Sequence, residues 1–255
     1  MRLKDSLAAG LCVAGLCLGL MTAGVAAAQP AYISKAVADQ TRPIKARDLD
    51  VTRKPVETLT FAGVKPGDKV ADLMPGAGYY TILFSDIVGP KGKVYAVVPQ
   101  EILKFGPRAT EGIIALQADH KNISLTSPPI NGFTTADKLD MVWTSWNYHD
   151  FHDPFMGPAD LAKVNKAIFD ALKPGGVYVI LDHAAQAGSG VRDTNTLHRI
   201  DIETVKAEVK AAGFVLDGTS TLLANPDDTH TLNVFDGKIR GHTDTFILKF
   251  RKPKG

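Results

Sequence analysis

Short apolar segments recur along most of the chain, and longer segments between them repeat their apolar residues every three or four positions. The short segments are rich in Val, Ile and Leu, as is typical of strands in a sheet that is covered on both faces. They predict strands at residues 70–74, 93–98, 123–125, 139–145 and 177–181. Strands that alternate with helices form a parallel sheet with right-handed crossovers.

Helices are predicted where the apolar residues follow the helical period. The first lies at 79–88, and an interrupted one lies at about 102–118. Two further helices carry apolar faces at Leu161, Val164, Ile168 and Leu172, and at Ile202, Val205, Val209 and Ala212. Asp201 is a suitable N-cap for the last of them, and Gly213 is suitable as its stop.

The end of the chain has two strand-like runs, at 220–223 and 243–249, without a helix between them. Such a pair predicts an antiparallel partner at the end of the sheet. The fold class is therefore α/β, a single doubly wound Rossmann-like domain at 61–255. Its sheet is mostly parallel and seven-stranded, with an antiparallel C-terminal strand. A polar N-terminal extension, helical near 55–61, occupies 29–60 before it.

Residues 1–28 have the pattern of a signal peptide. Arg2 and Lys4 precede an apolar run at 7–25, and three alanines at 26–28 fit a small-residue cleavage site. We expect cleavage after Ala28 and a periplasmic or secreted protein that keeps no stable membrane anchor. A retained anchor is the alternative, because the apolar run is nearly long enough to cross a bilayer.

Composition narrows the chemistry of the part that follows. Both cysteines, Cys12 and Cys17, lie within the predicted signal peptide. The remainder therefore has no disulfide, thiolate nucleophile or Cys-ligated metal. The sequence has 29 basic and 27 acidic residues, a balance that does not indicate a nucleic-acid surface. We expect a small-molecule substrate and no nucleic-acid partner.

The turn after the first predicted strand contains two glycines. Residues 70–80 read VADLMPGAGYY, an apolar strand, a turn with Gly76 and Gly78, and the start of a helix. Glycine in such a unit lets the backbone approach a ligand that faces the helix N-terminus. With the segments VYAVVP, WNYHDFHD and DTNTLHRIDIETVKAEVKAAGF, the chain resembles the class I S-adenosylmethionine-dependent methyltransferases over about residues 55–252. Within that superfamily it is similar to an exported bacterial branch.

The resemblance implies S-adenosylmethionine as the cofactor, with its methionine end at this turn. Asp72 would lie at the strand end, and Gly76 and Gly78 would bring backbone N–H groups close to the cofactor. Met74 and Pro75 would form the approach, although Met74 stands where the family has its first glycine.

The second predicted strand departs from the family, because no acidic residue ends it. An acid normally stands there and binds the ribose hydroxyls. Glu101 follows three residues after Val98 and is the expected substitute, unless it is only a solvated acid at a helix start. Two interpretations compete with S-adenosylmethionine binding. Either the turn belongs to a fold that no longer binds a cofactor, or the cofactor is a nicotinamide dinucleotide, which requires glycine where Thr81 stands.

Aromatic and titratable residues are concentrated after the fourth predicted strand. Residues 143–153 read WTSWNYHDFHD, and Asp182 and His183 end the neighbouring fifth strand. The carboxyl ends of parallel strands meet at the edge where α/β sheets bind ligands. Aromatic walls with a few titratable groups are typical of a small-molecule pocket. We expect Trp143 to contribute to the cofactor site.

Methyl transfer needs a positioned nucleophile and often a base, and histidine suits that role near neutral pH. The predicted catalytic residues are His149, Asp150, His152 and His183. Asp150 or Asp182 would orient the imidazoles. Alternatively, some of these histidines are structural and bond only to backbone groups.

Two alternative functions use the same fold. A metal-dependent enzyme would take ligands from His149, His152 and His183, with Asp153 and Asp182 nearby. A non-catalytic protein that binds a small molecule would explain Met74 and the missing acid. Neither alternative changes the predicted architecture.

The loop at 184–198 is long enough to act as a lid at the same edge of the sheet. It and the following residue contribute Arg192, Asp193, His198 and Arg199, which would face the pocket. The alternative is that both arginines only pair with nearby carboxylates.

Overall fold

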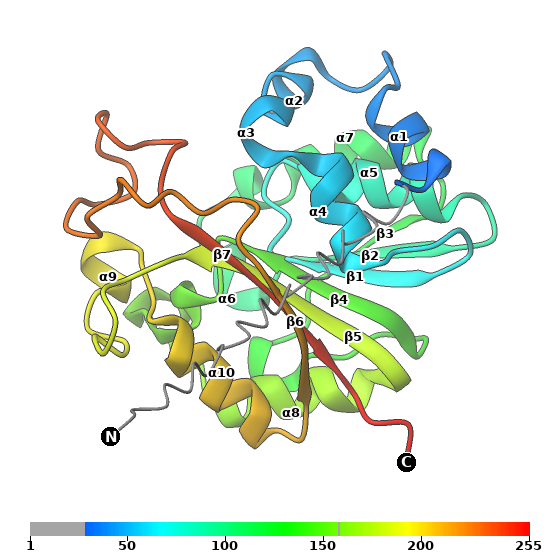
Figure 1. Ribbon diagram of the computed structural model, residues 1–255. Coiled ribbons are helices and arrows are strands. Elements are labelled where there is room, and N and C mark those ends of the chain that lie inside the picture. The colour runs from blue at the N-terminus through cyan, green and yellow to red at the C-terminus, as the bar shows by residue number, and fades with distance from the viewer. Residues whose placement is uncertain (1–28, 158) are drawn as a thin grey trace, which may run out of the picture.

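Seven strands form one sheet with helices on both faces in the computed structural model, which describes residues 29–157 and 159–255 (Figure 1). The predicted signal peptide at 1–28 lies outside the described residues. The strands are β1 Lys69–Leu73, β2 Lys93–Val97, β3 Ile123–Thr126, β4 Leu139–Ser145, β5 Leu172–His183, β6 Val215–Ser220 and β7 Thr245–Arg251. Their order across the sheet is β3-β2-β1-β4-β5-β7-β6. Within the described ranges no helix is both long enough and apolar enough to cross a membrane.

The predicted fold class is confirmed. The first five strands run parallel to one another, whereas β7 runs antiparallel to both β5 and β6. The central strands were predictable because their residues are almost all buried, so their sequences are continuously apolar.

The prediction of the sixth strand was wrong. It was placed at 220–223, but β6 is Val215–Ser220 and residues 221–244 form a long loop. As an edge strand, β6 has one exposed face, so only alternate residues are partly buried and its apolar signal is weak. Leu222 and Leu223 belong to the loop and pack against the core instead.

The sequence Lys-Pro-Gly-Gly at 173–176 stands directly before the fifth predicted strand, 177–181. It lies inside β5, where Leu172 pairs with Leu139 and Val177 pairs with Met141. Residues 173–176 therefore bulge out opposite Asp140, whose carboxylate binds Lys173 Nζ at 2.7 Å.

The helices pack in two layers. Those that cover one face or flank the sheet are α1 Ala31–Val37, α2 Ile44–Arg47, α3 Asp50–Arg53, α4 Pro55–Ala62, α5 Tyr79–Val88, α6 Gln100–Leu103 and α7 Glu111–Asp119. Later in the chain follow α8 Leu161–Ala171, α9 Thr194–Leu197 and α10 Ile202–Ala211. Short 3-10 turns lie at Pro107–Ala109, Ile130–Gly132, His149–His152 (η3) and Pro154–Met156.

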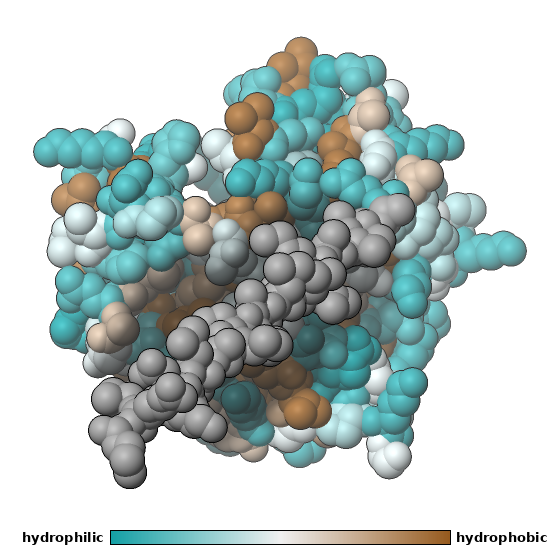
Figure 2. Space-filling view, in the orientation of Figure 1, coloured by the Kyte–Doolittle hydropathy of each residue, from teal (hydrophilic) through white to brown (hydrophobic). Residues whose placement is uncertain are grey.

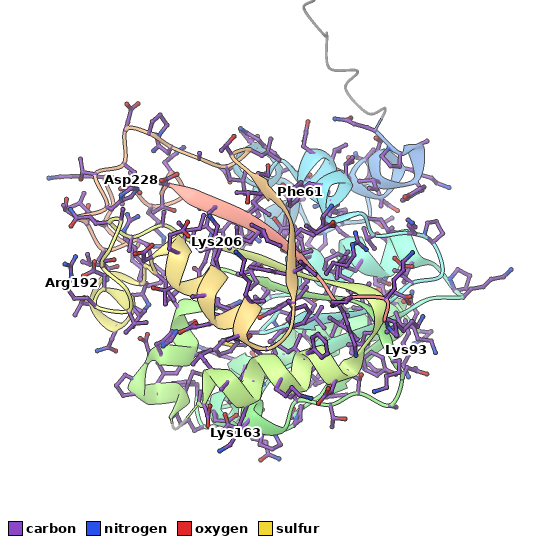
Figure 3. The ribbon with its side chains drawn as sticks, turned by 60° about the horizontal axis from the view of Figure 1, so that its bottom comes forward. Phe61, Lys93, Lys163, Arg192, Lys206 and Asp228 are labelled. Carbon is purple, nitrogen blue, oxygen red and sulfur yellow. The ribbon has the colours of Figure 1, made fainter. Side chains whose placement is uncertain are left out.

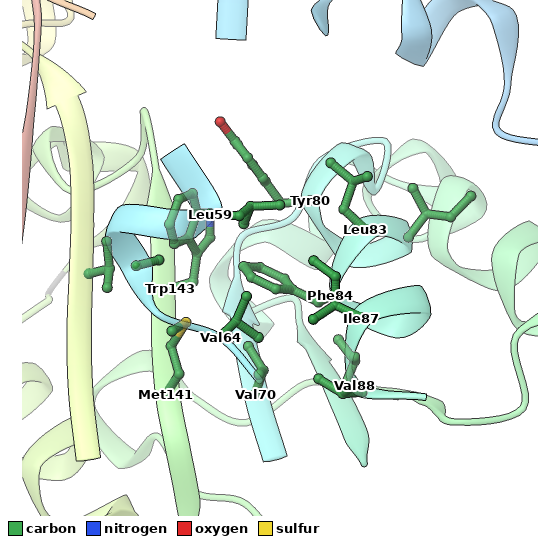
Figure 4. Close-up of a cluster of buried hydrophobic side chains, with 14 of the residues drawn as sticks. Leu59, Val64, Val70, Tyr80, Leu83, Phe84, Ile87, Val88, Met141 and Trp143 are labelled. Atoms are coloured by element: carbon green, nitrogen blue, oxygen red, sulfur yellow. The ribbon is translucent and has the colours of Figure 1, made fainter. Parts of the chain in front are cut away.

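Helix α5 is buried on almost every side. Phe84 and Ile87 pack toward Val70 and Met141 of the sheet, as Figure 4 shows. On the outer side α1 and α4 cover the helix and contribute Ile33 and other apolar side chains to the same cluster. Burying each large apolar side chain contributes about 1.5–3 kcal/mol to folding.

The other face of the sheet is covered by α8 and α10. The two helices lie side by side in Figure 3, and Lys163 of α8 points away from the sheet. Val164 and Ile168 of α8 and Val205 and Val209 of α10 are completely buried beneath them. Asp160 and Asp201 cap the two helices by accepting bonds from backbone N–H groups.

The N-terminal extension is tied to the main fold. The buried Arg42 guanidinium makes two bonds of 2.8 Å to the Asp50 carboxylate, and the Tyr79 hydroxyl donates to the same carboxylate at 2.7 Å. This arrangement fixes α3 above the N-terminus of α5. The predicted helix near 55–61 is α4.

Candidate functional site

The glycine turn at the end of β1 has an unusual backbone. Met74 has a φ of +57°, a left-handed conformation that glycine adopts most easily, and Gly76 has a φ of +56°. The Met74 N–H donates to the Val97 carbonyl at 2.9 Å, and Asn147 Nδ2 donates to the Met74 carbonyl at 3.0 Å. These bonds hold the Met74 backbone in the left-handed conformation that suits the family's glycine at this position. The strain energy is about 1–3 kcal/mol.

Asp72 lies beneath the turn and is almost completely buried. Its carboxylate accepts a hydrogen bond of 2.6 Å from the Thr81 hydroxyl. Burial raises the pKa of Asp72 to about 7, although the Thr81 bond and the charge of Arg53 oppose this shift. Asp72 is therefore close to half-protonated at neutral pH.

Two predicted cofactor residues have structural contacts. Both oxygens of Glu101 accept from the Ile130 backbone N–H, at 3.2 and 3.1 Å, so this carboxylate joins α6 to the segment after β3. Trp143 has no exposed surface, and its ring lies 4.6 Å from that of Tyr80 within the core. Trp143 is thus enclosed in the core, in contact with Tyr80 and Phe84 of α5.

A cavity of about 550 Å³ lies at the carboxyl edge of β4 and β5. It opens between the loop 221–244 and α3, where Figure 2 shows a notch between two lobes of the surface. Its floor includes Trp146, His183 and Thr245, and its walls include Arg53 and Phe235. Among the described residues, its lining does not include the glycine turn.

Arg53 connects the turn to the cavity. Its guanidinium carbon lies 4.3 Å from the centre of the Tyr79 ring and 4.8 Å from that of Trp146. Tyr79 begins the helix that follows the turn, and Trp146 lies on the cavity floor. Cation–π attraction therefore holds the cavity wall against the helix N-terminus.

His183 is the predicted catalytic residue that faces the cavity. Its Nδ1 lies 2.7 Å from the Thr243 hydroxyl, and its ring centre lies 6.1 Å from that of Trp146. Burial lowers the pKa of His183 to about 3. The negative charge of Asp182 opposes this shift, whereas the positive charges of His149 and Arg199 add to it. The ring is neutral at pH 7.

His149 lies behind this wall, with its ring centre 6.1 Å from that of His183. Asp182 accepts hydrogen bonds of 2.8 Å from both the Nδ1 and the backbone N–H of His149, which orients the imidazole as expected. Burial disfavours the imidazolium, but the charges of Asp182 and Asp150 outweigh it and raise the pKa of His149 to about 10. The same attraction lowers the pKa of Asp182 in spite of its burial.

His152 is not brought to the other histidines. Its Nε2 lies 3.3 Å from the Glu208 carboxylate of α10, which also accepts a bond of 2.9 Å from the Tyr148 hydroxyl. His149, His152 and His183 therefore do not form the expected metal cluster among the described residues. The reason is that η3 is a tight helical turn, which directs His152 toward α10.

Residues 50–202, more than half of the chain, match the ubiE/COQ5 methyltransferase family. The chain belongs to this family. The resemblance to the class I S-adenosylmethionine-dependent methyltransferases is thereby confirmed, whereas its export stays a prediction. The ubiE/COQ5 match includes the glycine turn, Asp182 and His198 but not the loop 221–244.

Known ubiE/COQ5 proteins are only partly covered. The ubiquinone/menaquinone biosynthesis C-methyltransferase UbiE of Shewanella piezotolerans is 32% identical over 129 residues, 49% of this chain and 46% of that protein. A protein-L-isoaspartate O-methyltransferase of Ignicoccus hospitalis is 28% identical over 119 residues, 47% of this chain and 49% of that protein. The chain thus spans about half the length of the curated relatives it matches.

A solved structure supports the same fold. The S-adenosylmethionine-dependent methyltransferase from Aquifex aeolicus has a TM-score of 0.56 at 19% identity and covers 86% of this chain and 98% of its own. At this identity the likeness concerns the fold alone.

Sequence reasoning missed two residues of this candidate site. The sequence predicts Arg53 only as part of a polar extension, and the packing of α3 brings it to the cavity. Thr243 carries no sequence signal, because the loop that delivers it is irregular. The alternative for the two arginines is confirmed, since Arg192 pairs with Asp193 and Arg199 pairs with the buried Asp228.

Proposed function

We propose that this chain transfers a methyl group from S-adenosylmethionine to a small molecule in the cavity. One observation carries the proposal: the glycine turn and the cavity adjoin. Asn147 bonds to the turn, the preceding Trp146 forms the cavity floor, and Arg53 touches both the cavity and the helix after the turn. A methyl donor held at the turn would therefore lie beside an acceptor in the cavity.

The turn suits the methionine end of the cofactor. Gly76 is exposed, and a side chain built on it would meet open space, so a ligand can approach the backbone there. The Tyr80 hydroxyl of the next helix is buried and has no hydrogen-bond partner among the described residues. These polar groups, with the N-terminus of α5, are the ones we expect to hold S-adenosylmethionine.

When bound, S-adenosylmethionine supplies a methyl group on a positively charged sulfur for an in-line displacement. The protein's part is to position the acceptor and exclude water. Trp146 and Phe235 provide flat apolar surfaces for the acceptor, and Arg53 and Arg240 provide positive charge. His183 is neutral, with Nδ1 engaged by Thr243, so Nε2 remains for a hydrogen bond to the acceptor.

This lining favours a small, flat, apolar acceptor with an acidic group. The cations would stabilise its ionised form, so that the acceptor needs no strong base. His183, with a pKa of about 3, then acts as a hydrogen-bond partner of the acceptor rather than as a general base. The UbiE relatives are C-methyltransferases of ubiquinone and menaquinone biosynthesis, and a carbon acceptor is the first type to test.

Calorimetric titration with S-adenosylmethionine and with its demethylated product tests the proposal. We expect saturable binding of both by residues 29–255. Gly76→Val should weaken binding at least tenfold, because its side chain blocks the approach to the backbone. Gly67→Val is the matched control, since Gly67 has a φ of +86°, also faces open space and lies at the opposite end of β1.

Two results would contradict the proposal. If high micromolar protein gives no heat of binding, S-adenosylmethionine is not its cofactor. Binding without turnover of any methyl acceptor would instead favour a non-catalytic binding protein on the same fold.

We also propose that the chain is exported and cleaved after Ala28, on the pattern of residues 1–28. Mass spectrometry of the protein from a periplasmic fraction should give a chain that begins at Gln29. A full-length chain confined to the cytoplasm would overturn this proposal.

A further inference from the structure

Three donor atoms from two segments of the chain converge beside the cavity. His149 Nε2 lies 3.2 Å from Asp150 Oδ1 and 3.3 Å from His198 Nδ1, and His198 Nδ1 lies 3.8 Å from Asp150 Oδ1. His149 and Asp150 belong to η3, and His198 follows α9. The sequence predicts His149 and Asp150 as catalytic residues and His198 as a loop residue that faces the pocket.

Hydrogen bonds among His149 Nε2, Asp150 Oδ1 and His198 Nδ1 cannot satisfy all three atoms at once. His149 Nδ1 is committed to Asp182, so only Nε2 faces the group. A single proton on Nε2 can serve either the carboxylate or His198, but not both. A cation that displaces this proton would accept one lone pair from each of the three atoms.

The spacing fits a small metal ion. Bonds of about 2.0–2.1 Å to histidine nitrogen or carboxylate oxygen, in tetrahedral geometry, separate the ligand atoms by about 3.3–3.4 Å. Two of the three separations, 3.2 and 3.3 Å, are close to this value, and the third is 3.8 Å. A shift of His198, whose side chain is 27% exposed, would close the difference.

The surroundings of His149 are those of a metal ligand. A metal-bound histidine usually donates its other ring N–H to a carboxylate, which fixes the ring. Asp182 has this role here, and the backbone N–H groups of His149 and His183 fix Asp182 in turn.

A nearby carboxylate is buried without compensation. Asp153 is 2% exposed, and the neighbouring Thr194 hydroxyl donates to the Val191 carbonyl instead. Neither Asp153 oxygen receives a hydrogen bond within the described part of the chain. Burial raises the pKa of Asp153, and the nearby His149 and His198 oppose this shift, so a divalent cation beside the site would favour the charged carboxylate.

We propose that His149, Asp150 and His198 bind a divalent transition-metal ion such as Zn²⁺, with Asp182 and Asp153 as supporting carboxylates. Two imidazoles and one carboxylate leave a fourth tetrahedral position for water. The ion would join the segment after β4 to the segment after α9, behind the cavity wall. This site does not rest on the proposed methyl transfer.

The test uses untagged residues 29–255, or the full chain, freed of metal with a chelator. Titration with Co²⁺ is followed by its visible absorption, and Zn²⁺ is measured by competition. We expect one equivalent of metal. His198→Ala and Asp150→Asn should each weaken binding at least tenfold, and Asp182→Asn about 10–100-fold.

His152→Ala is the matched control, because it removes a histidine of the same turn that bonds to Glu208 instead. Its metal affinity should stay within twofold of the parent protein. Asp150→Asn preserves the side-chain shape and so keeps the test valid if His198→Ala does not fold.

Failure to bind a stoichiometric metal, or an equal loss in His152→Ala and His198→Ala, would overturn the site. Titration of the same proteins with S-adenosylmethionine separates this outcome from a failure of the proposed methyltransferase.

Discussion

Single residues in this protein are held by buried charges whose partners lie far away in the sequence. Arg199 has no exposed surface and makes two bonds to Asp228, at 2.8 and 3.1 Å. The guanidinium also donates to the Leu232 and Ala184 carbonyls. One arginine thus fixes the loop 221–244, the far wall of the cavity, against the end of β5.

Arg199→Met should lower the free energy of unfolding by about 3–5 kcal/mol, because it leaves Asp228 buried without its cation. Urea denaturation measures the loss. Arg192→Met is the control, because Arg192 is exposed beside Asp193 and should cost less than about 1 kcal/mol. Equal losses in the two variants would contradict this account of the loop.

Asp72 should make stability depend on pH. Its pKa is about 7 in the folded protein but near 4 when unfolded, so between these values the folded state binds more protons. Its contribution to stability is therefore complete below about pH 4 and is lost as the pH rises through 7. The free energy of unfolding of Asp72→Asn should be close to that of the parent protein at pH 4. As the pH rises to 8, the variant should become increasingly more stable than the parent protein.

Urea denaturation at several pH values measures this difference. Asp170→Asn is the control, because the Asp170 carboxylate lies at the surface. A constant difference between parent and Asp72→Asn across the pH range would refute the raised pKa.

Residue-level roles were the least predictable part from sequence. His149 and His152 differ by three positions, yet one turns to Asp182 and the other to Glu208. The direction of each ring depends on the path of η3 and on partners from β5 and α10. No local pattern contains that information.

Elements were predictable where burial shaped their sequence. The five central strands and α5 follow from apolar runs and helical period, since both of their sides are covered. The edge strand β6 and the bulge inside β5 could not be predicted, because half-exposed residues and Gly-Pro turns give weak signals. The short helices α2 and α3 owe their position to Asp50 rather than to a pattern of their own.

Asp50→Ala should release α3 from the cavity wall and loosen the preceding α2. It removes the bonds to the Tyr79 hydroxyl and to the buried Arg42. Hydrogen exchange at residues 44–53 should become at least tenfold faster while β1 and β4 stay protected. Asp48→Ala, at an exposed position on the same segment, is the control. Equal exchange rates in both variants would contradict the role of the Asp50 bonds to Tyr79 and Arg42.

At the scale of the whole molecule, the core extends beyond the family match. Residues 50–202 lack Ile33 of α1, Val205 of α10 and all of β7, which are parts of the two apolar clusters. Without β7, one edge of β5 would be unpaired and β6 would have no partner. The segment that matches the family therefore does not contain the whole core of this protein.

A fragment of residues 50–202 should not show cooperative unfolding, whereas residues 29–255 should. Circular dichroism during a urea titration compares the two. A sharp transition of the shorter fragment at the same midpoint would mean that the outer helices and β7 add little.

The two tryptophans occupy different environments, and they are the only two in the sequence. Trp143 is enclosed in the core, whereas Trp146 lies on the cavity floor beneath Arg53. Trp143→Phe would leave a single tryptophan, at the candidate acceptor site, which can be excited selectively over the tyrosines. Its emission would then report directly on any molecule that enters the cavity, without a label.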